Sequence, residues 1–372
     1  MSVARIARFT TLTLAVLLSL ATLPCPPSAW AAGGSFLGKL DAIDSLASTV
    51  PRNGDVNPYG VAVVPRSVGR LVKGNILVSN FNNSTNSQGT GTTIVQVAPN
   101  HTVSLFAQIK PTDPHLNCPG GIGLTTALVV LRSGWVIVGS LPTTDGSAAT
   151  AQPGCLLVVN RSGRAVQTIQ GHSINGPWDM TAVEMNDHVA LFVTNVLNGT
   201  VAANGNPVNQ GTVVRLELAV DDDDPPEVLS ETIIGSGFGE RTDPAALVIG
   251  PTGVGVGRHG TLYVADTLAN RIAAIPDALF RETSAGTGET VSTMGALNGP
   301  LGLAIAPNGN ILVANSGDGN LVETTPDGDQ VAVTLVDTTG AGAGTLFGLA
   351  VAPGNKGVYF VNDGNNTLDF LH

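Results

Sequence analysis

The sequence predicts an all-β fold, a six-bladed β-propeller of four-stranded antiparallel blades, and three observations support this prediction. Short apolar runs separated by turn residues recur in six groups between residue 57 and residue 372. Gly is abundant, with 46 residues, and only 12% of the residues are charged, which is typical of short strands and many turns. The first run of most groups is rich in small residues and the second is bulky, as expected of strands crowded around a central axis.

The chain begins with the features of a secretory signal peptide. Two arginines precede an apolar stretch at 9–23, and residues 29–31 (Ala-Trp-Ala) have the small-residue pattern of a cleavage site. A retained membrane anchor is the alternative, but it needs about 20 apolar residues and this stretch is shorter. We therefore predict a signal peptide at 1–31, cleaved after Ala31, and a secreted or periplasmic protein.

After cleavage, residues 32–56 form a leader and residues 57–372 form a single propeller domain. The sixth group of apolar runs, which begins near residue 346, has only three runs. Residues 42–50 of the leader are expected to supply its fourth strand, because a ring closed in this way has no exposed sheet edge. A seven-bladed ring with one degenerate unit and a pair of β-sandwiches are the alternative folds.

The most regular repeat spans 298–336. Its four runs are separated by Pro-Asn-Gly and Pro-Asp-Gly sequences, which supply the positive φ of tight hairpin turns. One such sheet is too small to bury both of its faces, so it needs neighbours on either side. The first strands of the four units that start the ring are expected at 60–65, 125–131, 180–184 and 245–249.

Charge and cysteine content limit the classes of partner. The formal net charge is −11 and no Lys/Arg cluster occurs, which argues against nucleic acid and anionic membranes. No apolar run after the signal peptide is long enough to span a bilayer, and we expect a monomer. Cys118 and Cys155 can form a disulfide in an oxidising compartment, although the sequence leaves their separation open.

Two stretches resemble NHL repeats. They are GPLGLAIAPNGNILVANSGDGNLVETTPDG and GTLYVADTLANRIAAIP, which follow the family pattern P-x-G-[LVI]-A…P-[DN]-G…Y-V-[AT]-D/N…N-x-R-[IV]. The resemblance implies a six-bladed propeller. Related secreted and periplasmic propellers include gluconolactonase- and paraoxonase-like hydrolases, peptidylamidoglycolate lyases and streptogramin lyases, and NHL repeats also occur in proteins that only bind.

Polar residues are expected to gather at one mouth of the channel. Loops that enter first strands and loops that leave second strands lie on the same face of a propeller, so we predict a ligand site there. Its candidate residues are Asn80, Trp178, Asp179, Asn195, Asp243, Asp266, Asn315 and Asn362. Asn and Asp oxygens suit Ca²⁺, with Asn195 and Asp266 as the candidate ligands. The same residue types also cap turns by accepting nearby backbone N–H groups, which is the structural alternative.

The function predicted from these features is binding. We expect an exported scaffold or binding module that holds a protein or small ligand at the channel mouth, with no assigned catalytic residue or cofactor. The alternative is a Ca²⁺-dependent hydrolase or lyase of the gluconolactonase/paraoxonase type. Gluconolactonase-like propellers hold their metal with a Glu on an inner strand, and here the one candidate, Glu184, lies at the far end of its strand. Whether the protein is an enzyme therefore stays open.

Overall fold

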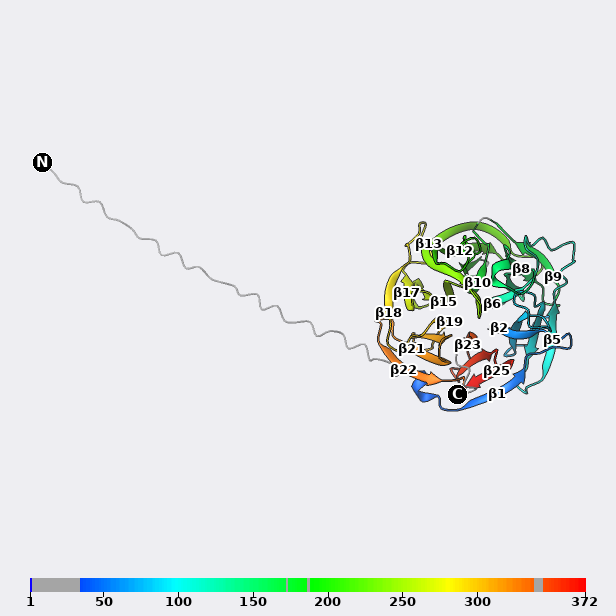
Figure 1. Cartoon of the computed structure of the whole chain (residues 1–372). Helices are drawn as coiled ribbons and strands as arrows, with labels where there is room; N and C mark the ends of the chain where they lie inside the picture. The colour runs from blue at the N-terminus through cyan, green and yellow to red at the C-terminus, as the bar shows by residue number, and fades with distance from the viewer. Residues whose placement is uncertain (2–33, 172, 186–187, 338–343) are drawn as a thin grey trace. The chain divides into compact units, whose positions relative to one another are not determined.

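A computed structural model describes Met1 and residues 34–171, 173–185, 188–337 and 344–372, so the predicted signal peptide falls outside the described residues apart from Met1. The described chain is all-β apart from three short 3-10 turns. Six antiparallel sheets surround a central axis, and the innermost strands contact one another in a closed circle in which β23 meets β2 (Figure 1). The predicted six-bladed propeller is confirmed.

Each blade runs outward from the axis in chain order. Blade 1 holds β2 (Val56–Val63), β3 (Ile76–Asn82), β4 (Thr93–Val97) and β5 (Val103–Gln108). Blade 2 holds β6 (Leu124–Val130), β7 (Val136–Ser140), β8 (Cys155–Val159) and β9 (Ala165–Ile169). Blade 3 holds β10 (Pro177–Met185), β11 (His188–Asn195), β12 (Val208–Ala219) and β13 (Glu227–Asp243), and β14 (Leu247–Ile249) is added to its outer edge.

The second half of the ring follows the same order. Blade 4 holds β15 (Pro251–Val256), β16 (Leu262–Asp266), β17 (Arg271–Ile275) and β18 (Glu289–Thr293). Blade 5 holds β19 (Pro300–Ile305), β20 (Ile311–Asn315), β21 (Asn320–Thr324) and β22 (Gln330–Leu335). Blade 6 holds β23 (Leu346–Val351), β24 (Val358–Asn362) and β25 (Thr367–Leu371), and β1 (Ile43–Ser48) is its outermost strand.

The leader closes the ring as predicted. β1 pairs antiparallel with β25, from Ile43 opposite Leu371 to Ser48 opposite Thr367. The segment before β1 is fixed to blade 5 by the Glu323 carboxylate, which accepts hydrogen bonds from the backbone N–H groups of Phe36 and Leu37 at 2.9 and 2.7 Å. The N- and C-terminal parts of the propeller are thereby held together, with β1 as the outermost strand of blade 6.

The predicted first strand of unit four is wrong. Residues 247–249 form β14, which pairs with the end of β13, and the inner strand of blade 4 is β15. The physical reason is space near the axis. A Cβ atom at Gly253 would lie 2.4 Å from the backbone nitrogen of Leu303 in the next blade, so β15 approaches blade 5 more closely than a side chain at this position would allow.

The predicted disulfide is present. Cys118, in the loop that enters blade 2, is bonded to Cys155 at the start of β8, with their Cα atoms 5.4 Å apart. None of the helices in the described ranges has the length and apolar character that a membrane crossing requires.

Candidate functional site

The predicted mouth residues lie where the topology puts them, at the N-terminal ends of inner strands, the C-terminal ends of second strands, or the β13–β14 turn. Seven of the eight are buried and Asp243 is half-buried. Most of their polar atoms join neighbouring backbone segments. For example, Asn80 Nδ2 donates to the carbonyl of Thr49 at 3.0 Å, and Asn315 Nδ2 donates to that of Ala296 at 2.8 Å. Their role as ligand-binding groups stays a prediction.

Each candidate calcium ligand has one oxygen engaged, while Asp266 Oδ1 has no partner among the described residues. Asn195 Oδ1 accepts a hydrogen bond from the backbone N–H of Asn175 at 3.2 Å. Asp266 Oδ2 pairs with the guanidinium of Arg271 at 2.9 Å. Burial raises the pKa of Asp266, and the Arg271 contact opposes that rise. Among the described residues, no group of three or more His, Cys, Asp or Glu side chains is arranged to hold a metal ion.

An apolar plug closes the channel on this face. We define it by Tyr59, Phe81, Trp178, Leu247 and Phe347, which are buried members of one cluster. The Tyr59 ring stacks on Phe81 and Phe347 with centroid distances of 4.3 and 3.9 Å. Trp178 Nε1 donates to the carbonyl of Val248 at 3.0 Å, which fixes the β14 segment to the plug. Because its members come from blades 1, 3 and 6 and from β14, they meet across the axis.

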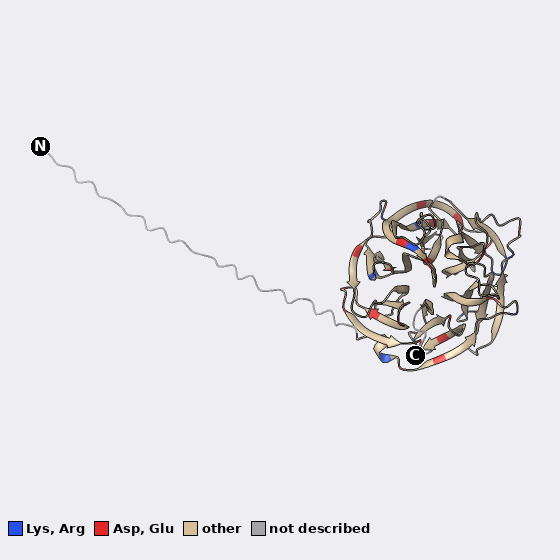
Figure 2. Ribbon diagram, viewed as in Figure 1, with Lys and Arg blue, Asp and Glu red and all other residues tan. Residues whose placement is uncertain are grey.

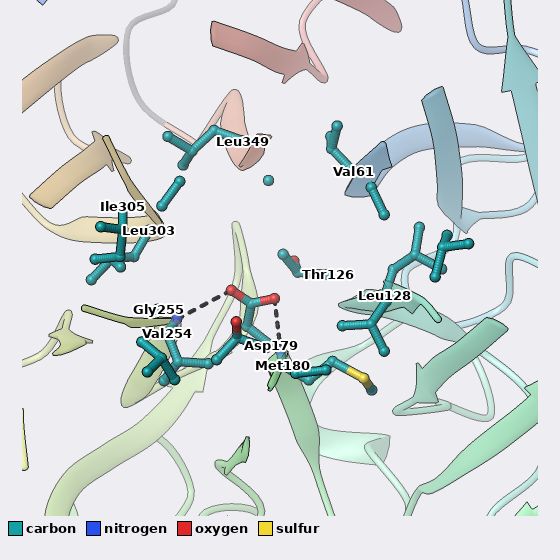
Figure 3. Close-up of a pocket in the computed structure, with 18 of the residues that line it drawn as sticks. Val61, Thr126, Leu128, Asp179, Met180, Val254, Gly255, Leu303, Ile305 and Leu349 are labelled. Atoms are coloured by element: carbon teal, nitrogen blue, oxygen red, sulfur yellow. Dashed lines mark hydrogen bonds between the residues drawn. The ribbon is translucent and has the colours of Figure 1, made fainter. Parts of the chain in front are cut away.

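The channel is more accessible at its opposite end. In every inner strand, buried residues give way to half-buried ones toward the C-terminal end. A cavity of about 320 Å³ lies on the axis and is lined by residues of all six inner strands. Its wall includes one or more aliphatic or thioether side chains from each, such as Val61, Leu128, Met180, Val254, Leu303 and Leu349 (Figure 3). The free edges of the inner strands also present peptide groups to the axis.

Asp179 is the acidic group at the closed end of this cavity, and it is only 8% exposed. Its Oδ1 accepts the backbone N–H of Met180 at 2.8 Å, and its Oδ2 accepts that of Val254 at 3.3 Å (Figure 3). Burial raises the pKa of the Asp179 carboxyl well above its usual range, although both backbone hydrogen bonds oppose the rise. The Asp179 carboxyl can therefore meet a ligand in its neutral or its charged form, depending on the charge of that ligand.

Thr126 is the second polar group at this level. It is 4% exposed, it lines the same cavity, and its hydroxyl has no hydrogen-bond partner among the described residues. A buried hydroxyl without a partner is uncommon in a folded protein. Thr126 is not among the candidate residues that the sequence pattern indicates.

The pairing register shows that Asp179 and Thr126 occupy equivalent positions in neighbouring blades. In every blade a residue near the start of the inner strand lies opposite the polar residue at or near the end of the second strand, such as Pro177 opposite Asn195, Leu124 opposite Ser140 and Pro58 opposite Asn80. Two residues further on, the other four blades have glycine, at positions Gly60, Gly253, Gly302 and Gly348. At each of these glycines a Cβ atom would lie within 3 Å of a neighbouring blade. Blades 2 and 3 alone carry a side chain at this position, and both side chains are polar.

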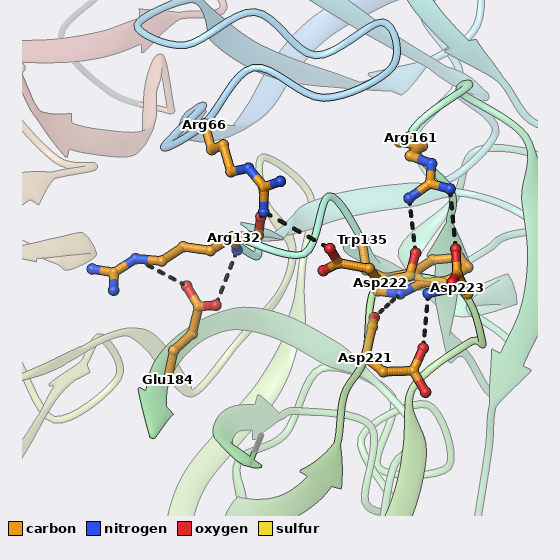
Figure 4. Close-up of polar contacts among 8 residues, drawn as sticks. All are labelled: Arg66, Arg132, Trp135, Arg161, Glu184, Asp221, Asp222 and Asp223. Atoms are coloured by element: carbon orange, nitrogen blue, oxygen red, sulfur yellow. Dashed lines mark hydrogen bonds and ion pairs between the residues drawn. The ribbon is translucent and has the colours of Figure 1, made fainter. Parts of the chain in front are cut away.

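The rim at the open end carries paired charges. The Glu184 carboxylate, at the end of β10, accepts the backbone N–H of Arg132 at 3.0 Å and lies 4.0 Å from its guanidinium (Figure 4). Farther from the axis, Arg161 and Arg66 contact the acidic 221–224 loop, and Trp135 Nε1 donates to the carbonyl of Asp221 at 2.9 Å (Figure 4). This loop therefore links blade 3 to blades 1 and 2.

Comparisons with known proteins support the fold. No protein-family model matches the chain, and no curated protein matches its sequence.

Among solved structures, a gluconolactonase from Xanthomonas campestris has a TM-score of 0.53 at 12% identity, over 88% of this chain and 88% of that chain. The calcium-binding protein regucalcin from Agrobacterium tumefaciens has a TM-score of 0.53 at 13% identity, over 87% of this chain and 92% of that chain. A luciferin-regenerating enzyme has a TM-score of 0.54 at 10% identity, over 88% and 94%. Likeness at such low identity shows the fold alone: the chain is a six-bladed β-propeller with gluconolactonase-like propellers among its structural neighbours.

Proposed function

We propose that this protein is an exported binding propeller that holds a small ligand in its central channel. The observation that carries the proposal is the axial cavity of about 320 Å³, which combines aliphatic walls with a few convergent polar groups. Small-molecule sites in proteins have this composition, and the volume lies at the lower end of their range. If each non-hydrogen atom takes about the 30 Å³ that a water molecule occupies in the liquid, the cavity suits a ligand of about ten such atoms.

The proposal keeps the predicted binding role and changes the route to the site. A ligand would reach the cavity from the C-terminal ends of the inner strands, because the plug fills the mouth that the sequence pointed to. Of the eight predicted residues, Asp179 alone lines the cavity. Export is supported by the signal-peptide pattern and by the disulfide between Cys118 and Cys155, which fits an oxidising compartment.

Ligand-observed NMR with small amphipathic compounds tests this function. Ala182 lines the cavity in its half-buried part, so Ala182→Trp should fill the channel and abolish binding without touching the plug. The control is Ala269→Trp, since Ala269 is exposed in the turn between β16 and β17 and does not line the cavity. Compounds that bind the wild type and the Ala182→Trp variant equally would contradict a channel site.

The Ca²⁺-dependent hydrolase or lyase remains the second candidate, on the strength of the predicted Asn195 and Asp266 ligands. A mouth metal should raise the melting temperature in Ca²⁺, because it binds the folded state preferentially. Asn195→Ala and Asp266→Ala should each remove that rise. Identical melting curves with Ca²⁺ and with a chelator would exclude the calcium site in this form.

A further inference from the structure

We propose that the channel selects a small organic ammonium ion, whose charged head is held at the closed end between Asp179 and Thr126. This inference rests on the proposed channel-binding function and adds the chemical class of the ligand. It follows from the residues at one equivalent position of the six inner strands. Blades 2 and 3 have the polar side chains of Thr126 and Asp179 there, and the other four blades have glycine.

Asp179 lacks a counter-ion within the cavity. Among the residues that line it, none is Lys, Arg or His, and the only other acid is Glu184 at the open end, which pairs with Arg132. The two backbone N–H groups that Asp179 accepts occupy one lone pair on each oxygen, and a carboxylate has further acceptor sites. A buried carboxylate with no cationic partner is costly, and a cation at this position would remove most of that cost.

Thr126 supplies a second acceptor for the same head group. Its hydroxyl oxygen is buried and has no partner among the described residues, so a ligand N–H would satisfy an atom that the protein leaves unsatisfied. An ammonium group has three N–H donors and can reach a carboxylate, a hydroxyl and a peptide carbonyl at once. A carboxylate ligand has no N–H donor, and Asp179 would repel it wherever the Asp179 carboxyl is ionised.

The rest of the channel limits the body of the ligand. Aliphatic side chains surround the axis between Asp179 and the open end, so a short alkyl or similarly narrow group can follow the ammonium head. The formal net charge of −11 also favours cations over anions at the protein surface, and Figure 2 shows acidic residues spread around the ring with few Lys and Arg between them.

Binding of such an ion should be linked to pH. The titratable groups facing the cavity from its lining strands are Asp179 at the closed end and Glu184 at the open end, and the cation beside Glu184 at the rim is Arg132. A bound ammonium ion opposes the effect of burial and lowers the pKa of Asp179 again, so binding should release a proton where the empty site is protonated. Affinity should then rise with pH until the amine itself loses its proton.

Calorimetric titration with three probes of one size tests the inference: n-pentylamine, 1-pentanol and pentanoate. We expect pentylamine to bind about tenfold or more tightly than pentanol, and pentanoate more weakly than either. Asp179→Asn and Thr126→Val should each reduce the preference for the amine. Thr126→Val also covers the case in which Asp179→Asn folds poorly, since it removes a hydroxyl that has no partner in the described fold.

The matched controls lie outside the channel. Glu240→Gln changes another buried carboxyl of raised pKa, and Thr324→Val changes another buried hydroxyl without a partner among the described residues. Neither should alter the amine preference. If pentanol or pentanoate binds as tightly as pentylamine, the ammonium inference fails and the channel-binding function stands. If none of the three probes binds, both are overturned.

Discussion

Glu240 provides a sharp test of the electrostatics of blade 3. Its side chain is fully buried in the long strand β13, where Oε1 accepts the backbone N–H of Asn198 at 2.9 Å. Oε2 has no partner among the described residues. Burial raises the pKa of Glu240 from 4.5 to about 8, although its contacts with Asn198 oppose the rise.

The sign of the pH effect follows from this pKa. Between pH 4.5 and about 8 the unfolded chain loses the Glu240 proton while the folded chain keeps it, so the folded state becomes less stable as the pH rises through this window. Each pKa unit corresponds to about 1.4 kcal/mol, which places an upper limit of about 5 kcal/mol on the penalty. Glu240→Gln should remove most of it, because glutamine has the same shape and does not titrate.

Urea denaturation of the wild type and Glu240→Gln at pH 5 and pH 9 measures the effect. The stability of the variant relative to the wild type should increase by about 2–5 kcal/mol between the two pH values. Glu323→Gln is the control, because Glu323 is buried but accepts hydrogen bonds that outweigh burial and lower its pKa. Its difference from the wild type should stay constant over this range. A constant difference for Glu240→Gln as well would refute the reasoning.

Three further changes test the fold. Glu323→Gln should lower stability at pH 7 by about 2–3 kcal/mol and expose the leader to limited proteolysis, because the leader loses charge-assisted hydrogen bonds. Cys118→Ser should cost about 2–4 kcal/mol by opening a loop with a sequence separation of 37, and its melting temperature should no longer depend on reductant. Trp178→Ala should cost about 3–5 kcal/mol by emptying part of the plug, whereas Trp178→Phe should cost less, as measured by denaturation.

The fold could be predicted because its signals are local. Hairpin turns such as Pro307-Asn308-Gly309 mark strand boundaries, and the missing fourth strand of blade 6 pointed to the leader. Blade 3 and the start of blade 4 were harder. The runs at 245–249 and 251–256 are both short and apolar, and the close approach of β15 to the next blade at Gly253 is a property of the folded ring that no local pattern displays.

The candidate site was only partly predictable. Asn and Asp at strand ends look the same whether they bind a ligand or backbone groups. The plug joins residues as distant in sequence as Tyr59 and Phe347, so no local sequence pattern indicates that it closes the predicted mouth. Asp179 could have been recognised as unusual from the sequence, because in Pro-Trp-Asp it stands where the NHL-repeat pattern P-x-G has glycine. The missing hydrogen-bond partner of Thr126 is a property of the folded ring alone.

The ring position shared by Asp179 and Thr126 is informative about function, because burying polar side chains there costs free energy in the empty propeller. Gly60, Gly302 and their equivalents show that this level of the channel can be built without side chains. Burying a carboxyl without a counter-ion and a hydroxyl without a partner costs desolvation free energy at both positions. Groups in this condition are typical of ligand sites, where the ligand supplies the absent partner. Asp179 and Thr126 lie in adjacent blades and face one cavity. A single ligand with several N–H donors can therefore offset the free-energy cost of burying both side chains.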